Sequence, residues 1–150
     1  MQDVNIYIAT TARGPAKRKT AYYIYILECR KGDKTATREG RGQLKQCTEN
    51  QIELTGLSKA FQRITQPCSV RVFTQCEHVL NSMNNHWVSQ WEKNGWKKAG
   101  DKPVKNMELW QQLMNLMRQH NVTFTDEAHE YSMWLNLELE KMKVRNDGEE

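Results

Sequence analysis

The sequence has no apolar run that approaches the roughly 18–20 residues needed to span a membrane. Its start also lacks a basic stretch followed by an apolar one, so we expect no secretory signal peptide. No internal repeat or linker divides the chain. These absences predict one cytoplasmic domain over residues 1–150, with no membrane partner and with residues 144–150 as a frayed tail.

Cysteine is too sparsely placed to predict a metal site. The four cysteines form no CxxC pair, and zinc sites usually need ligands that lie closer together in sequence. We expect reduced, mostly buried thiols. A nucleophilic pair of Cys76 with His78 is a weaker alternative. The cysteines are Cys29, Cys47, Cys68 and Cys76.

The composition is that of a folded domain with a mild excess of positive charge. Hydrophobic residues make up 38% of the chain and charged residues 27%, which favours a globular protein over a disordered one. The formal net charge is +4, which fits a polyanionic partner. Residues 87–110, which we call the basic protrusion, contain four of the five tryptophans and five lysines. Lysines and flat rings in one segment favour binding to a nucleic-acid backbone.

β-Branched, aromatic and alternating apolar residues predict five strands. The clearest is TAYYIYILEC, which a turn at residues 31–34 joins to a third strand with a polar face. The predicted strands cover residues 4–8, 20–29, 35–41, 69–74 and 121–125.

Apolar residues at helical spacing predict the other elements. Thr48 is the expected N-cap of the first helix. Gly95 and Gly100 interrupt the helical pattern, which predicts that the lysine-rich stretch is a protruding loop between helices. The order βββαβαααβα predicts an α/β fold: a five-stranded mixed sheet, three antiparallel strands then two parallel ones, with helices on both faces. The helical patterns cover residues 48–64, 77–91, 105–120 and 126–143.

These motifs, in this order, resemble ribonuclease H of the bacterial type 1 family over nearly the whole chain. The resemblance is strongest from Trp87 to Leu113, and Thr48–Leu54 is similar to the start of the family's first helix. Val70–Thr74 resembles the strand that precedes one of its metal-binding aspartates. The resemblance implies the ribonuclease H-like fold. It also implies a two-metal nuclease, in which four carboxylates hold two Mg²⁺ ions roughly 3.5–4 Å apart.

The resemblance carries over few of those carboxylates. Glu53 on the first helix is kept, but Ala9 and Gln75 stand at the first-strand and fourth-strand positions. The last-helix position falls near Trp134 or Asn136. Alanine offers no oxygen and glutamine no charge, and one glutamate cannot offset the dehydration of Mg²⁺. We therefore expect a pseudoenzyme with no metal site and no cofactor.

Two alternatives to this loss remain open. Asp126, Glu127 and Glu130 rebuild a carboxylate cluster in one alternative, and in the other they only cap the last helix. Glu53 is likewise either a metal ligand or an acid stabilised by the helix dipole. His129 is the candidate for a histidine that the family carries before its last helix.

The resemblance also assigns residues to nucleic-acid binding. Trp87 and Trp91 share one face of a helix, where they either support the protrusion or touch the ligand. A separate basic cluster is hypothesised to add phosphate contacts; it comprises Arg13, Lys17, Arg18 and Lys19. The candidate binding residues are Thr48, Asn50, Gln51, Trp87, Trp91, Trp96, Lys97, Lys98, Lys102 and Lys105.

The first interpretation is a monomeric ribonuclease H-like protein without catalytic activity. It binds an RNA–DNA hybrid or another duplex through shape, phosphates and 2′-hydroxyls. The second is an active ribonuclease H that cleaves the RNA of RNA–DNA hybrids with a rearranged site and Mg²⁺ or Mn²⁺. The third is a protein-interaction module that uses the fold without any nucleic acid.

Overall fold

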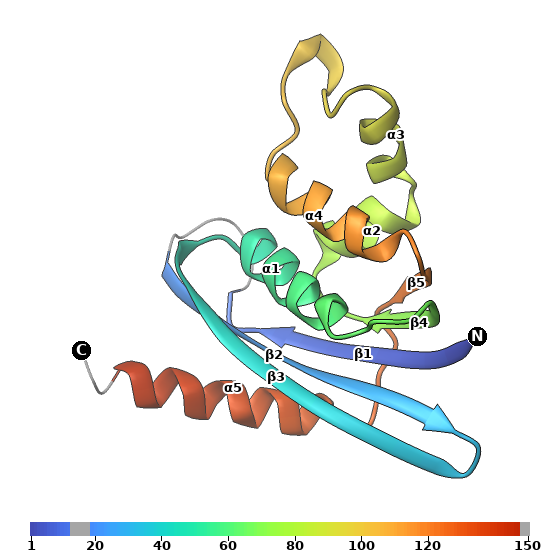
Figure 1. Cartoon of the computed structure of the whole chain (residues 1–150). Coiled ribbons are helices and arrows are strands. Elements are labelled where there is room, and N and C mark those ends of the chain that lie inside the picture. The colour runs from blue at the N-terminus through green and yellow to red at the C-terminus, as the bar shows by residue number, and fades with distance from the viewer. Residues whose placement is uncertain (13–18, 148–150) are drawn as a thin grey trace.

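The computed structural model describes residues 1–12 and 19–147, and its strands form one five-stranded sheet in the order β3-β2-β1-β4-β5 (Figure 1). β2 pairs antiparallel with both β1 and β3. β4 pairs parallel with both β1 and β5, so the predicted mixed sheet is confirmed. The strands are β1 (Gln2–Thr10), β2 (Lys19–Lys31), β3 (Lys34–Cys47), β4 (Cys68–Phe73) and β5 (Asn121–Thr125).

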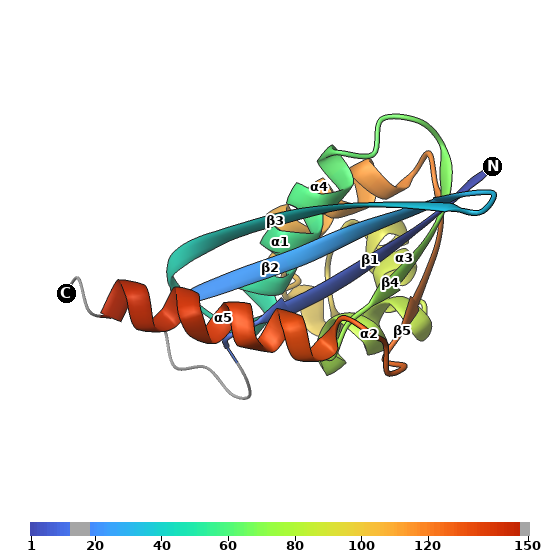
Figure 2. The ribbon, with the colours of Figure 1, turned by 90° about the horizontal axis from the view of Figure 1, so that it is seen from below.

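Helices lie on both faces of this sheet, as predicted. α1 packs on one face beside α2 and α4, and α5 crosses the opposite face (Figures 1 and 2). The predicted order βββαβαααβα is confirmed. The helices are α1 (Glu49–Gln62), α2 (Glu77–Asn84), α3 (Trp87–Lys93), the 3₁₀ helix η1 (Ala99–Asp101), α4 (Met107–Met117) and α5 (Ser132–Asp147).

The strand β2 is buried on both faces because helices cover both sides of the sheet. Tyr23 and Tyr25 point into the larger core beneath α1. Tyr22, Ile24 and Ile26 point into a smaller core beneath α5. This explains why the segment reads as a nearly continuous apolar run instead of an alternating one.

The helical pattern of residues 77–91 does not form one helix. α2 ends at Asn84, and His86 adopts a left-handed φ of 59° before α3 begins. An α-helix cannot continue through a left-handed residue, so the chain turns there. The third strand is also longer than expected, because its pairing with β2 continues as far as Cys47.

The last helix begins at Ser132, not at Asp126, and runs to Asp147 instead of ending at Lys143. Side chains form hydrogen bonds with the backbone of residues 126 and 127, and these bonds hold this segment in a non-helical conformation. Gln75 donates to the Asp126 carbonyl at 3.0 Å, and the Glu127 N–H donates to the Thr125 hydroxyl at 3.2 Å. Residues 148–150 of the predicted tail lie outside the described residues.

Within the part of the chain that the structure describes, no helix is long and apolar enough to cross a membrane.

Candidate functional site

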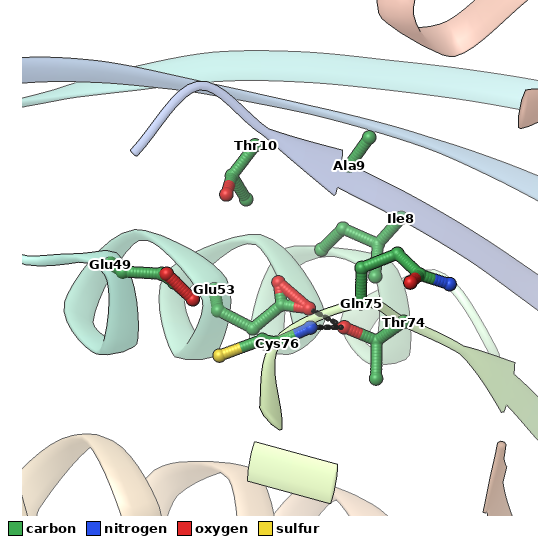
Figure 3. Close-up of a pocket in the computed structure, with 8 residues that line it drawn as sticks. All are labelled: Ile8, Ala9, Thr10, Glu49, Glu53, Thr74, Gln75 and Cys76. Atoms are coloured by element: carbon green, nitrogen blue, oxygen red, sulfur yellow. Dashed lines mark hydrogen bonds between the residues drawn. The ribbon is translucent and has the colours of Figure 1, made fainter. Parts of the chain in front are cut away.

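A small cleft lies where β1 and β4 end beside the first turns of α1 (Figure 3). Parallel pairing aligns Tyr7 with Phe73, so both strands deliver their following residues to the same edge of the sheet. The fold therefore brings together Ala9, Glu53 and Gln75, which the sequence assigned to one site. The lining residues are Ile8, Ala9, Thr10, Glu49, Glu53, Thr74, Gln75 and Cys76.

The Glu53 carboxylate is buried, with 2% of the residue exposed, and it accepts a hydrogen bond from the Thr74 hydroxyl. The same hydroxyl oxygen accepts a hydrogen bond from the Cys76 N–H at 3.1 Å. The carboxylate is thus tied to the turn that follows β4 (Figure 3). Such pairing is what lets a polar side chain stay buried.

The Cys76 thiol is buried beside this pair, 3.6 Å from the Asn50 side-chain oxygen. Burial, with a smaller effect of the Glu53 charge, raises the pKa of Cys76 to about 12. A nucleophilic cysteine needs the opposite shift, because the thiolate is the reactive form. This geometry weighs against the Cys76–His78 alternative. Within the described residues all four cysteines are free thiols, as expected.

Ala9 and Gln75, the two positions where the sequence predicts lost carboxylates, both have other partners in the structure. The Ala9 methyl points away from Glu53 and packs with the core beneath α5 (Figure 3). The Gln75 side-chain amide donates a hydrogen bond to the Asp126 carbonyl. Glu127 turns to Arg71, with 3.1 Å between its carboxylate and the guanidinium.

One acid of the cleft, Glu49, was not singled out by the sequence. It lies one turn before Glu53 on α1, and the four-residue spacing was the available signal. The cleft thus contains two carboxylates, both on one helix. In the described ranges 1–12 and 19–147, no group of three His, Cys, Asp or Glu side chains is arranged so that it could hold a metal ion. This donor set does not fit the pair of Mg²⁺ ions that the family resemblance implies, because each ion needs several anionic or strongly polar oxygens.

His129 is held in a cluster of rings with Tyr7, Phe73 and Tyr131, which belong to the core beneath α5. Its ring centroid is 4.5 Å from that of Tyr7 and 5.6 Å from that of Phe73. Its Nδ1 accepts a hydrogen bond from the Tyr131 N–H at 3.1 Å. Burial lowers the pKa of His129, against a smaller opposing effect of Glu130. The segment before α5 is therefore anchored to the sheet through this ring.

The start of α1 is built by a capping box. The Thr48 hydroxyl accepts from the Gln51 N–H, and the Gln51 side chain accepts from the Thr48 N–H at 3.0 Å. The Gln51 amide also donates to the Asn106 side chain at 3.2 Å, which joins α1 to the start of α4. Asn106 is a second residue that sequence reasoning missed, since only the fold places it there. The roles of Thr48, Asn50 and Gln51 in nucleic-acid binding stay predictions.

The tip of the basic protrusion is a small turn with its own hydrogen bonds. Lys98 N–H donates to the Lys102 carbonyl at 2.7 Å, and Val104 N–H donates to the Trp96 carbonyl at 3.0 Å. Gly100 turns the chain with a φ of 78°. This arrangement leaves all five lysines exposed; they are Lys93, Lys97, Lys98, Lys102 and Lys105.

The tryptophans of the protrusion divide into support and surface. Trp110 is fully buried and Trp96 is 9% exposed, so both belong to the core. Trp91 is half-buried and meets Trp110 edge to face, with 6.0 Å between ring centroids. Trp87 is 40% exposed. Of the three tryptophans predicted to bind nucleic acid, Trp87 presents the largest free surface.

The second basic cluster is only partly covered by the structure. Arg13, Lys17 and Arg18 lie outside the described residues, and Lys19 is exposed at the start of β2. The hypothesis that this cluster contacts phosphate stays a prediction.

Comparison with known proteins shows that this chain is similar to ribonucleases H. A family profile described as RNase H matches residues 2–132. Ribonuclease H of Clostridium botulinum (strain Hall) is 35% identical over 128 residues, which cover 83% of this chain and 81% of that protein. The solved structure of LC9-RNase H1, a type 1 RNase H with the type 2 active-site motif, superposes with a TM-score of 0.74. It is 20% identical, and the match covers 90% of this chain and 69% of that one.

A second solved structure is the foamy viral protease-reverse transcriptase in complex with RNA/DNA hybrid. Its TM-score is 0.67 at 16% identity, and the match covers 91% of this chain and 18% of the viral one. At these identities, the two structures support the fold.

Proposed function

The chain belongs to the ribonuclease H family, and from that premise we propose that it binds RNA–DNA hybrid duplexes without cleaving them. One observation carries this proposal. Ala9 and Gln75 stand at two of the expected metal-binding positions of the cleft, whereas the protrusion keeps its five lysines in solvent. The part of the molecule suited to hold a polyanion is retained, and the part that would cut it is depleted of carboxylates.

The binding half of the proposal rests on charge and rigidity. Exposed lysines neutralise phosphates and release counterions, which favours any duplex. A-form-like geometry and 2′-hydroxyls then select hybrids over ordinary DNA. The buried Trp96 and Trp110 hold the lysines at a defined place, so little conformational freedom is lost on binding. All these residues come from one chain, so a monomer suffices to bind.

The non-cleaving half rests on the surroundings of Glu53. Its carboxylate accepts a hydrogen bond from the Thr74 hydroxyl and is shielded from solvent. A first-strand or fourth-strand acid that could share a cation with Glu53 is missing, since Ala9 and Gln75 stand at those positions and face other partners. Hydrolysis of a phosphodiester by the family's route needs metal ions at the scissile bond, and several carboxylates must hold them there.

A labelled RNA–DNA hybrid incubated with the protein and Mg²⁺ or Mn²⁺ tests both halves. We expect salt-dependent binding, detected by fluorescence anisotropy, and intact RNA on a denaturing gel. Metal-dependent cleavage that disappears in Glu53→Gln would overturn the proposal. Absence of affinity for hybrid, duplex RNA and duplex DNA would leave the protein-interaction alternative.

The second candidate is an active ribonuclease H with a rearranged site. Glu49 favours it, because this acid adds a second carboxylate to the cleft one turn from Glu53. In that case Glu49→Gln and Glu53→Gln would each abolish cleavage while leaving hybrid affinity in place. Equal absence of cleavage in both variants and in the unchanged protein supports the first candidate.

A further inference from the structure

The four histidines of the chain fall into two kinds. His120 and His129 serve the fold, because the Nδ1 atom of each accepts a backbone N–H, with 3.1 Å between the two nitrogens in both cases. A ring nitrogen that accepts a hydrogen bond has to stay unprotonated, so these two rings are committed to the neutral form. His78 and His86 are exposed, and their rings are open to a partner that arrives from solvent.

His78 lies where the basic protrusion meets the cleft. It is the second residue of α2 and follows Cys76, which lines the cleft, by two positions. Its ring meets the ring of Trp110, the last residue of the protrusion, edge to face with 6.4 Å between centroids. His86 lies beyond the other end of α2, at the turn into α3. The two exposed histidines are therefore at opposite ends of one helix, and His78 is the one beside the cleft.

Two charged side chains act on His78 from the elements that face it. Burial of part of the ring is the main cause that lowers the pKa of His78; the Lys98 charge lowers it further, and the Glu49 charge opposes both. Lys98 belongs to the tip of the protrusion and Glu49 to the cleft, so each region contributes one charge. On α2 and its cap the neighbours are the exposed Glu77 and the Cys76 thiol, which stays protonated because its pKa is about 12. The ring of His78 is therefore neutral at pH 7 and becomes a cation in mild acid.

A hybrid that binds as proposed passes this ring, and this step rests on the proposed function. The tip holds phosphates through its exposed lysines, Lys98 among them. Thr48, Asn50 and Gln51, at the start of α1, are the predicted contacts on the cleft side. A duplex carries one negative charge for about every 1.7 Å of its axis, so a duplex that reaches both places brings phosphates to the surface between them. His78 lies on that surface.

We propose that His78 is a conditional phosphate contact of this surface: the protonated ring pairs with a backbone phosphate of the bound hybrid, and hybrid binding takes up a proton from solvent. The proton adds to a free ring nitrogen, and no covalent bond of the nucleic acid forms or breaks. A phosphate beside the ring favours the imidazolium, because an opposite charge stabilises the charged form of its neighbour. The lysines of the protrusion stay charged at neutral pH, so their share of binding does not depend on pH in this range.

The direction of the pH dependence follows from proton linkage. Below the pKa of His78 in the free protein, the ring is charged before the hybrid arrives, and affinity is highest. Affinity falls as the pH rises from there. It levels off above the pKa of His78 in the complex, where the ring is neutral in both states. Ordinary carboxyl groups titrate at about pH 4, below this window.

Fluorescence anisotropy of a labelled RNA–DNA hybrid with the whole chain, from about pH 5.5 to about pH 8.5 at constant ionic strength, tests the inference. We expect affinity to be about three- to tenfold higher at the acid end, tenfold being the effect of a rise of one unit in the pKa of His78 on binding. His78→Gln should show the affinity of the alkaline end at every pH. His86→Asn is the matched control, because it removes the other exposed histidine and asparagine tolerates the left-handed backbone of that position. The pH dependence should remain in this control.

A permanent cation separates a phosphate contact from a structural role of the ring. His78→Lys should bind the hybrid at the alkaline end about as tightly as the unchanged protein does at the acid end, and without a dependence on pH. A purely structural histidine would not be rescued in this way. NMR titration of the His78 ring, with and without saturating hybrid, gives a second readout, because its pKa should rise in the complex. Circular dichroism checks that all three variants keep their fold.

Several results would contradict the contact and leave the proposed function standing. Equal pH dependence in His78→Gln and in the unchanged protein would overturn the inference, because another group would then take up the proton. Affinity that does not change over this pH range, or a pKa of His78 that stays the same in the complex, would overturn it as well. In each of these cases the hybrid still binds. Absence of hybrid binding at every pH would instead overturn the proposed function, and this inference with it.

Discussion

The basic protrusion and the cleft beside Glu53 differ in where their polar groups point. The lysines of the protrusion end in solvent, while buried rings such as Trp96 and Trp110 fix their backbone. In the cleft the situation is reversed: Glu53 is buried and paired with Thr74, and Gln75 is paired with the segment before α5.

The difference shows how charge is used in each region. A charge that stays hydrated is available to a partner and adds little to folding. A buried carboxylate with fixed partners contributes to the fold, and a cation would have to displace those partners. The two regions can therefore be separated by substitutions that move stability and binding in different ways.

The largest effect is expected from the support of the protrusion. Trp110→Ala removes a fully buried ring that packs against Trp91 and His78, and should lower the free energy of unfolding by about 3–5 kcal/mol. Urea denaturation measures this loss. Trp87→Ala is the control, with an expected cost below about 1 kcal/mol because the ring is 40% exposed. Similar losses from both substitutions would contradict the division into support and surface.

The next largest effect is expected from substitutions at Glu53 in the cleft. Glu53→Ala leaves the Thr74 hydroxyl without its acceptor and should cost about 1–3 kcal/mol of stability. Glu53→Gln keeps an oxygen and should cost less. Added Mg²⁺ should not raise the melting temperature of the unchanged protein. A Mg²⁺-dependent rise that vanishes in Glu53→Gln would show that the carboxylate holds a metal after all.

Neutralising two lysines of the tip should change binding and not stability. Lys97→Gln with Lys98→Gln should weaken hybrid affinity about tenfold and reduce the slope of log affinity against log salt by about 2. Lys31→Gln with Lys34→Gln, at the exposed β2–β3 turn, removes the same charge elsewhere and serves as the control. Equal weakening by both pairs would mean that net charge, and not the protrusion, governs binding.

The smallest effect is on His78, which reports on both regions at once. Its ring lies against Trp110, with 6.4 Å between centroids. Burial and then the Lys98 charge lower the pKa of His78, while the Glu49 charge opposes them. NMR titration should therefore find a higher pKa in Lys98→Gln and a lower one in Glu49→Gln. Unchanged values in both variants would show that His78 feels neither region.

The lowered pKa of His78 also makes the stability of the protein depend on pH. Because the folded state holds the pKa of His78 below its ordinary value, the neutral ring's contribution is fully present above the unfolded pKa. It is lost as the pH falls through the folded pKa. Acid should therefore destabilise the protein slightly less when His78→Gln removes this group.

Much of the cleft could be predicted because its residues are close to recognisable motifs. Ala9 lies near the end of β1, Glu53 lies near the start of α1 and Gln75 follows β4, and the order of these elements was readable from the chain. Glu49 and Asn106 were missed for different reasons. Glu49 looks like any acid in the first turn of a helix, and Asn106 meets Gln51 only after residues far apart in sequence are packed together.

Tryptophan shows the same limit. The sequence placed Trp87, Trp91 and Trp96 in one basic segment, but periodicity does not say which ring faces the core. The left-handed residues His86 and Trp96 redirect the chain on either side of α3, and this decides their burial. Helix α5 is similar, because both of its sides are apolar and only contact with the sheet separates them.

The sequence by itself determined the order of the elements and the family, because these depend on residue type and on local spacing. The loss of metal-binding carboxylates at Ala9 and Gln75 stays a prediction from the family resemblance. Tertiary structure decided which charges are buried and which are free. It paired Glu53 with Thr74, turned Ala9 toward the core, and left the lysines and the outer side of α5 in solvent. Burial is a property of packed elements, and it sets whether a polar group serves the fold or a partner.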